Sequence, residues 1–202
     1  MAELSKLGIL DFQQKVKGGV RPNLFQVYHE FPEKAKPADD KLESYLCKSA
    51  ALPASTVGTV ELPFRGRVLK VPGDRTFESW TATFYMDDAF DLRGAYERWI
   101  DLTNRVDVNR SDAALTSDSP GATLQDISIL QLDKFSEKAV SNKGLSTIRE
   151  YKLIGAFPVS VSQISLAYDN NDSYEEFDVE FAYQFFTTGG GSGNNLIEQA
   201  AD

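Results

Sequence analysis

Residues 175–187 constrain the fold more than any other part of this 202-residue chain, because large apolar and polar side chains alternate along them. The apolar positions are Phe177, Val179, Phe181, Tyr183 and Phe185, and the positions between them are Glu176, Asp178, Glu180, Ala182 and Gln184. Successive side chains of a strand point to opposite faces, so this pattern predicts a strand with one buried face. Burying each large apolar side chain is worth about 1.5–3 kcal/mol, which fixes the register firmly.

The other apolar patterns also predict strands. The chain contains 13 Phe and 8 Tyr, and aromatic residues favour strands. Strands are expected at residues 24–31, 43–50, 76–86, 124–138, 146–157, 162–168 and 175–187. The sequence Pro72-Gly73-Asp74 indicates a turn before the third of these strands. The predicted fold class is mainly β, with antiparallel sheets that form a sandwich or barrel and one flanking α-helix.

That helix is expected within residues 87–103. Its apolar stripe consists of Ala89, Leu92, Tyr96 and Trp99. Asp87 or Asp88 is expected to cap the amino end, where the helix dipole favours acidic side chains. Capping explains these acids more simply than a magnesium site does. A shorter and weaker amphipathic helix is expected within residues 4–17.

One domain is expected over residues 1–188, followed by a flexible glycine-rich tail over residues 189–202. Residues 1–20 form an amino-terminal arm of this domain, and residues 103–123 form a long polar loop. Residues 57–70 alternate in places but are interrupted by two glycines and a proline. They therefore predict an exposed hairpin arm rather than a core strand.

Residue types that carry catalysis or bind metals are scarce. His29 is the only histidine, so a catalytic triad or a histidine-rich metal site lacks its usual member, and His29 is expected to be structural. Cys47, the only cysteine, has no internal disulfide partner. A calcium-loop spacing begins at Asp169, but Tyr174 stands where such a loop requires glycine. We therefore predict no catalytic, cofactor or metal site.

The formal net charge is −9, so the basic surface that general nucleic-acid binding needs is lacking. The polar face of residues 175–187 carries Glu176, Asp178 and Glu180. These acids are expected to form a solvated polar face of the strand. No apolar stretch of about 18 residues occurs, so membrane insertion is not expected.

Five short blocks follow one another along the chain. They are RPNLFQV (21–27), KSAALPAS (48–55), VPGDRTFESWTATFYMDD (71–88), YKLIGAFPVSVSQISLAYDNND (151–172) and EEFDVEFAYQFF (175–186). Together they resemble the tail tube proteins of contractile-tailed bacteriophages across most of residues 20–187. The tail-tube fold is also similar to that of secretion-system tube proteins.

The resemblance implies a structural virion protein rather than an enzyme. Hexameric rings would close a continuous inner β-barrel and stack into the tail tube, the conduit for DNA ejection within a contractile sheath. The implied partners are further copies of the chain, the tail sheath protein, the tape-measure protein, and the baseplate and tail terminator proteins. Genomic DNA would pass through without sequence-specific binding. Assembly would take place in the host cytoplasm, without a cofactor.

The resemblance also suggests roles for two groups of side chains. The arm at residues 57–70 is the candidate for ring-to-ring stacking, through Phe64, Arg65 and Arg67 near its tip. An ordinary surface hairpin is the alternative for this arm. The acids Glu176, Asp178 and Glu180 are the candidates for the lumen wall.

The sequence leaves two alternative functions, a baseplate protein and a hydrolase. A baseplate protein that initiates the tube would share this fold, but it is expected to carry extra matter at one end, whereas this chain is near the size of the bare fold. A hydrolase that uses the paired acids Asp87 and Asp88 belongs to a different class. The lone histidine and the absence of a nucleophile motif argue against it.

Overall fold

The computed structural model describes residues 8–16, 19–39, 41–107, 123–133, 146–169, 171 and 173–189. Its helices are α1 (Ile9–Val16), α2 (Leu42–Leu46) and α3 (Asp91–Thr103). Its strands are β1 (Phe25–His29), β2 (Cys47–Ala50), β3 (Ser55–Phe64), β4 (Arg67–Phe77), β5 (Trp80–Tyr85), β6 (Gln125–Asp133), β7 (Ser146–Val161), β8 (Glu176–Ala182) and β9 (Phe185–Gly189). The chain is mainly β, which confirms the predicted fold class.

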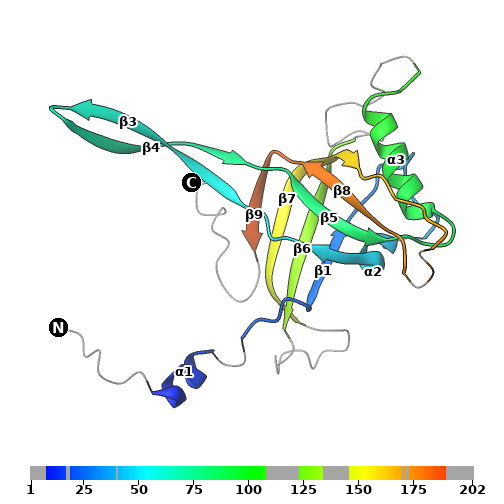
Figure 1. Cartoon of the computed structure of the whole chain (residues 1–202), viewed down its shortest axis with the longest axis horizontal. Coiled ribbons are helices and arrows are strands. Elements are labelled where there is room, and N and C mark those ends of the chain that lie inside the picture. Colours follow the sequence, from blue (N-terminus) through cyan, green and yellow to red (C-terminus); the bar gives the residue numbers. More distant parts are fainter. Residues whose placement is uncertain are drawn as a thin grey trace.

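The strands form a seven-stranded antiparallel sheet and a separate two-stranded ribbon. The sheet order is β1-β6-β7-β8-β5-β2, with β9 also paired to β7, and the ribbon consists of β3 and β4. Figure 1 shows α3 flanking the sheet on the side away from the ribbon, which projects from the body. The predicted flanking helix and projecting hairpin are both present.

The longest strand, β7, forms the spine of the sheet. One of its edges pairs with β6, while the other pairs first with β9 and then with β8. Leu153 lies opposite Phe186 in the β9 section, and Phe157 lies opposite Ala182 in the β8 section. Strands β8 and β9 are therefore two sections of one partner strand, and β7 joins the two halves of the sheet.

A local irregularity at Gly155 separates these two sections. Gly155 has a φ of +62°, in the left-handed region that glycine adopts without steric cost. Beside it, the backbone N–H of Gln184 donates to the carbonyl of Ile154 at 3.0 Å. A Cβ atom on Gly155 would lie 3.3 Å from Cγ of Gln184, so this close approach also favours glycine.

The alternation predicted at residues 175–187 is confirmed in β8 but not in β9. The buried side chains of β8 are Phe177, Val179 and Phe181. In contrast, Phe185 is 44% exposed. The single strand predicted here is divided into two sections, because regular strand structure is interrupted at Tyr183 and Gln184 while the register with β7 is kept.

Helix α3 closes the core with an aromatic face. Its buried side chains are Leu92, Ala95, Tyr96 and Trp99. The ring of Tyr96 lies 5.3 Å from that of Phe84 and 5.8 Å from that of Phe181, measured between centroids. The indole N–H of Trp99 donates to the carbonyl of Thr123 at 2.7 Å, so its polar atom is satisfied within the core.

The amino end of α3 confirms capping by Asp87. Its carboxylate accepts hydrogen bonds from the backbone N–H groups of Asp91 at 2.8 Å and Leu92 at 3.2 Å. Ala89, which was expected in the apolar stripe, is exposed and precedes the helix, because the helix begins only at Asp91. Ala95 takes a buried position instead.

The strand predicted at residues 43–50 is only half correct, since its first part forms the helix α2. This helical turn allows the hydroxyl of Ser44 to donate to the carbonyl of Val27 at 2.6 Å. It also places Leu42 and Leu46 against the core. Tertiary contacts with β1 therefore override the local strand preference.

The predicted turn at Pro72-Gly73-Asp74 is wrong, because β4 continues through it to Phe77 and β5 begins only at Trp80. Pro72 lies opposite Thr59 in the β3–β4 ribbon, next to a shift of register. Both strands of a two-stranded ribbon are edge strands, where proline is tolerated.

The strand predicted at residues 162–168 is also wrong. Instead, β7 is longer than expected and reaches Val161, after which the chain leaves the ladder. The guanidinium of Arg93 on α3 donates to the carbonyl of Ser162 at 3.0 Å, which ties this departure to the helix. Residues 108–122, 134–145 and 190–202 lie outside the described residues, so most of the predicted loop and the tail are not tested.

Helix α1 confirms the middle of the helix predicted at residues 4–17. None of its residues is buried, and Ile9, Leu10 and Phe12 are all more than half exposed. Figure 1 shows α1 standing apart from the sheet.

We predict that His29 makes stability depend on pH. Its Nε2 lies 2.9 Å from the hydroxyl of Tyr96, which confirms a structural role. Burial lowers the pKa of His29 from 6.5 to about 4, against the opposing effect of a hydrogen bond with the carbonyl of Glu30. The unfolded chain therefore binds more protons between pH 6.5 and 4, and the free energy of unfolding should fall by about 3 kcal/mol across this window.

Urea titrations at several pH values would measure this fall. In His29→Gln, an amide replaces the imidazole and does not titrate there, so the difference in slope between the two proteins reports the histidine. Parallel slopes in the two proteins would contradict a neutral, buried His29.

We also predict very different costs for two phenylalanine truncations in the same sequence block. Phe181→Ala should lower the free energy of unfolding by about 3–5 kcal/mol, because the side chain is fully buried. Phe185→Ala, the matched control, should cost about 1 kcal/mol or less, since its side chain is partly in solvent. Equal costs in urea unfolding would contradict the interruption between β8 and β9.

Candidate assembly surfaces

The β3–β4 ribbon, called the arm below, projects from the body as a long hairpin (Figure 1). Its register runs from Ser55 opposite Phe77 to Phe64 opposite Arg67. Arg65 and Gly66 form the turn with φ values of 47° and 80°. Positive φ at both positions is the requirement of the two-residue turn that best matches strand twist. The predicted arm at residues 57–70 is thus confirmed and is longer than expected.

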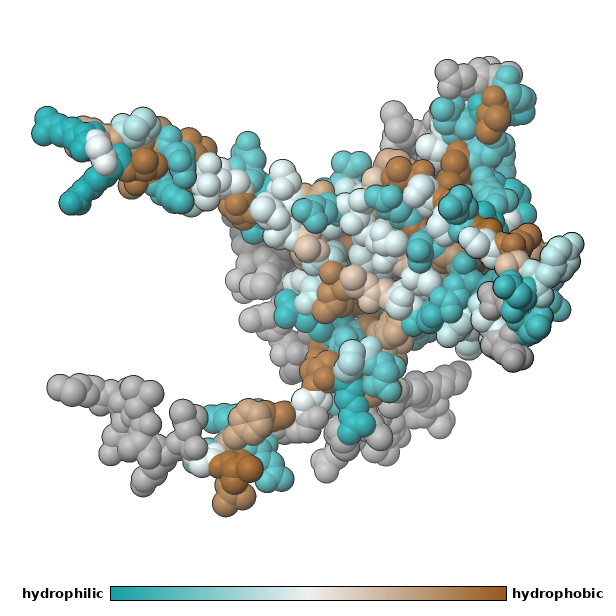
Figure 2. Space-filling model, viewed as in Figure 1, coloured by the Kyte–Doolittle hydropathy of each residue, from teal (hydrophilic) through white to brown (hydrophobic). Residues whose placement is uncertain are grey.

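One face of the arm is apolar. Directly opposed residues share a face, and the pairs on this face are Val60 with Val71, Leu62 with Leu69, and Phe64 with Arg67. The five apolar side chains among them are between 38% and 68% exposed. On the other face, Glu61 and Lys70 form an ion pair at 3.4 Å. Figure 2 shows apolar side chains along the arm, far from the core.

The arm is expected to need contacts with another surface to be stable in water. An isolated two-stranded hairpin is at best marginally stable in water, and exposed apolar patches mark contact surfaces. The predicted stacking residues lie together at its tip, where the guanidinium of Arg65 lies 5.2 Å from the ring centroid of Phe64. The apolar face behind this tip was not predicted, although the alternation of Val60, Leu62 and Phe64 was a usable signal for it.

The three acids predicted to share a face do so. Glu176, Asp178 and Glu180 lie on the side of β8 that faces away from the buried phenylalanines. The hydroxyl of Thr83 donates to Asp178 at 2.7 Å, and that of Ser160 donates to Glu180 at 3.3 Å. The surface is therefore a polar one, in which hydroxyl groups surround the carboxylates.

Lys48 also lies on this face, and no pattern in the sequence predicted it there. Its ammonium group donates to Oε2 of Glu176 at 2.6 Å, and this hydrogen bond raises the pKa of Lys48. Lys48 lies on β2 and reaches Glu176 across β5. No local pattern could have revealed a partner 128 residues away. One of the three acidic charges is thus balanced within the chain.

Several strand edges of the sheet are open. Strands β1 and β2 end the strand order, so within the described ranges each has a strand partner on one side only, although the hydroxyl of Ser44 on α2 donates to the carbonyl of Val27 in β1. Among the described strands, β9 has β7 as its one partner. Unpaired backbone N–H and C=O groups along such edges can pair with another chain.

The last feature of the surface is the placement of side chains that could bind a metal ion or carry catalysis. Among the described residues, no group of three or more His, Cys, Asp and Glu side chains is placed to hold a metal ion. The carboxylate of Asp87 is occupied with the backbone of α3. No helix in the described part of the chain is long and apolar enough to cross a membrane.

Open sheet edges and an exposed apolar arm are together typical of subunits that assemble with further chains. Comparison with known proteins identifies the family. A family model described as phage tail tube protein matches residues 20–189, which is most of the chain. The chain therefore belongs to the phage tail tube protein family, as the sequence blocks predicted.

A known relative is tail tube protein gp19 of Enterobacteria phage T4. It is 26% identical over 166 residues, which cover 82% of this chain and 90% of the relative. Two solved structures share the fold at 16% identity. A chain in the anti-feeding prophage baseplate has a TM-score of 0.53 and covers 83% of this chain, with 93% of its own length aligned. A chain in the PVC sheath-tube complex of an extracellular contractile injection system has a TM-score of 0.52, with 89% and 97% covered.

Proposed function

We propose that this chain is the major tube protein of a contractile phage tail. Hexameric rings of the chain stack into a hollow tube within the sheath, and the genome leaves the virion through it. The observation that carries the proposal is the arm, because the apolar face of this long hairpin is exposed to solvent and packs against nothing in the described core. Family membership supports the same function.

Ring closure follows from the open sheet edges. Identical chains that pair edge to edge in a head-to-tail manner form a closed ring when the rotation between them divides a full turn. Closure satisfies backbone groups that a single chain leaves to water, and it removes the risk of uncontrolled edge pairing. The arms then extend from the ring and contact the ring above or below it.

The acidic face is proposed to line the lumen. In such a ring, Glu176, Asp178 and Glu180 would repeat around the axis, with hydroxyl groups beside Asp178 and Glu180 and with Lys48 balancing the charge of Glu176. A negative, hydrated wall repels the phosphates of DNA, which carry one negative charge per about 1.7 Å of duplex. The genome would therefore slide without adhering. The ordinary solvated strand face is the alternative that the experiment below distinguishes.

The proposed partners are the sheath protein, the tape-measure protein, and the baseplate and terminator proteins, besides further copies of this chain. Structural similarity to a chain in a sheath-tube complex supports the sheath protein as a partner, and similarity to a chain in a baseplate supports the baseplate protein. We place the protein in the virion tail after assembly in the host cytoplasm. It acts there as a structural element, without enzymatic activity or a cofactor.

A baseplate protein that initiates the tube is the second candidate, because the fold is about equally similar to chains from both assemblies. Copy number separates the two candidates. Quantitative mass spectrometry of purified virions should find many rings' worth of this chain for a tube protein. A single ring's worth would favour the initiator.

Purified protein is predicted to form stacked rings in negative-stain electron microscopy. Leu62→Ser combined with Leu69→Ser should abolish stacking, because both side chains lie on the apolar face of the arm. The melting temperature should change little, since neither side chain is part of the core. Val68→Ser, on the opposite face of the same hairpin, is the matched control and should still stack. Normal tubes from the double variant would contradict the role of the arm.

The lumen placement has its own test. Asp178→Lys combined with Glu180→Lys should leave particle assembly intact and slow genome ejection, because a basic wall attracts phosphate. Glu33→Lys combined with Asp39→Lys is the control, since these exposed acids lie on a loop outside β8. The readout is the infectivity of assembled particles. Equal infectivity of the two variants would refute the lumen placement.

A further inference from the structure

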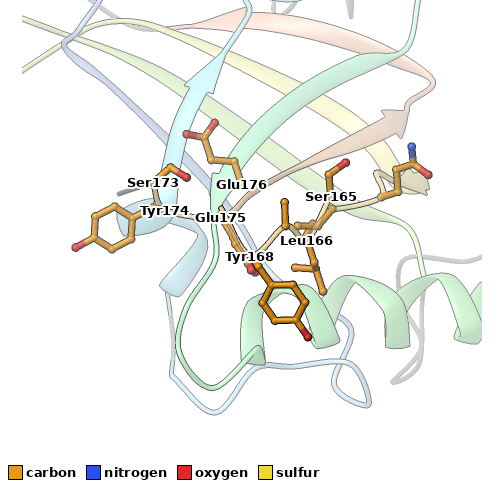
Figure 3. A pocket seen from close by; sticks show the side chains of 10 residues that line it. Ser165, Leu166, Tyr168, Ser173, Tyr174, Glu175 and Glu176 are labelled. Atoms are coloured by element: carbon orange, nitrogen blue, oxygen red, sulfur yellow. The ribbon is translucent and has the colours of Figure 1, made fainter. Parts of the chain in front are cut away.

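A surface hollow of about 570 Å³ lies between residues 163–168 and 173–176. Figure 3 shows Leu166 and Ser165 on one side of it and the segment from Ser173 to Glu176 on the other. Several of its side chains are apolar or aromatic and largely in solvent: Leu166 is 80% and Tyr174 84% exposed. These exposed side chains contribute little to the hydrophobic core of a single chain.

The hollow and the arm lie at opposite ends of the same pair of strands. The arm leads into the start of β5, where Trp80 lies opposite Phe181 of β8. The hollow lies at the other end of this pair, where Tyr85 is opposite Glu176. Figure 1 agrees, because the arm extends from one end of the body and the connection from β7 to β8 lies at the other. Two such surfaces can meet only between different copies.

The charges of the two surfaces are complementary. The arm, residues 55–77, contains Arg65, Arg67, Lys70 and Arg75 against two acids, Glu61 and Asp74. Among the residues that line the hollow, Glu175 and Glu176 are acidic and none is a lysine or arginine, while Lys48 on β2 already balances the charge of Glu176. Asp169, which directly follows the lining residue Tyr168, and Glu175 are both exposed. A basic tip and an acidic receptor attract each other and also fix the orientation of the contact.

We propose that the hollow receives the tip and the apolar face of the arm from a second copy of this chain. The inference rests on the proposed stacking of rings and names the surface on which each arm ends. A hairpin with strands of 10 and 11 residues extends by about 30 Å, at roughly 3.3 Å per residue, which allows it to cross from one body to the next. The contact is heterologous, so it adds rings in one direction without limit.

The chemistry of the two surfaces fits this contact. Leu62, Phe64 and Leu69 of the arm bury apolar area against Leu166 and the rings of Tyr168 and Tyr174. Guanidinium groups stack favourably on tyrosine rings, so Arg65 and Arg67 gain partners from the same residues that line the hollow. The contact removes apolar side chains of both surfaces from water and brings opposite charges together. The strength of stacking therefore depends on the buried apolar area and on charge.

A charge-swap experiment tests the inference on the full chain. The arm variant carries Arg65→Glu and Arg67→Glu, and the hollow variant carries Asp169→Arg and Glu175→Arg. Each variant alone should form rings but no tubes, because like charges then meet at every stacking contact. A one-to-one mixture should restore tubes of alternating rings, since each variant arm meets a complementary hollow. The variant Glu33→Arg with Asp39→Arg is the matched control and should form tubes alone.

Failure of the inference and failure of the proposed function give different results. If wild-type protein forms no tubes under any condition, stacking itself is wrong. If wild-type protein forms tubes but the mixture does not, or if the hollow variant forms tubes alone, the hollow is not the receptor.

A second measurement covers the case in which a charge variant does not fold. Phe64→Cys combined with Leu166→Cys should yield a ladder of disulfide-linked multimers on non-reducing gels of oxidised tubes. Burial raises the pKa of the native Cys47 to about 12, which keeps this thiol unreactive. Phe64→Cys combined with Val159→Cys, an exposed position outside the hollow, is the control and should give no ladder. Equal ladders from the two pairs would overturn the inference.

Discussion

The antiparallel ladder between β7 and the combined β8 and β9 sections holds the molecule together. It joins the β1–β6 half of the sheet to the β5–β2 half, and it presents Phe177 and Phe181 to the aromatic face of α3. A slip of one residue would turn this aromatic face to water and the acids of β8 into the core. The same register therefore determines both which side chains stabilise the fold and which ones face outward for assembly.

The surfaces that we assign to assembly contribute little to the stability of one chain. The arm lies outside the core, the acidic face is solvated, and the hollow is open. Folding and assembly are thus carried by separate sets of residues. Arm substitutions can abolish stacking without unfolding the subunit, whereas a core substitution such as Phe181→Ala affects both.

Local patterns predicted a large part of this structure. The alternation in β8, the stripe of α3 and the interrupted arm all follow from side chains close in sequence. The errors arose where distant contacts decide the outcome. Residues 42–46 form a helix whose Ser44 bonds to β1, and a positive φ at Gly155 accompanies the break between β8 and β9. Lys48 reaches Glu176 from a strand 128 residues away, and the hollow follows no periodic pattern, so neither left a local signal.

The most direct test of the central claim is a cryo-electron microscopy reconstruction of the purified, self-assembled protein. Our account predicts rings in which strands of neighbouring copies pair edge to edge, with each arm crossing to the next ring. Density that shows only solitary subunits, or stacked rings with their arms free in solvent, would contradict it.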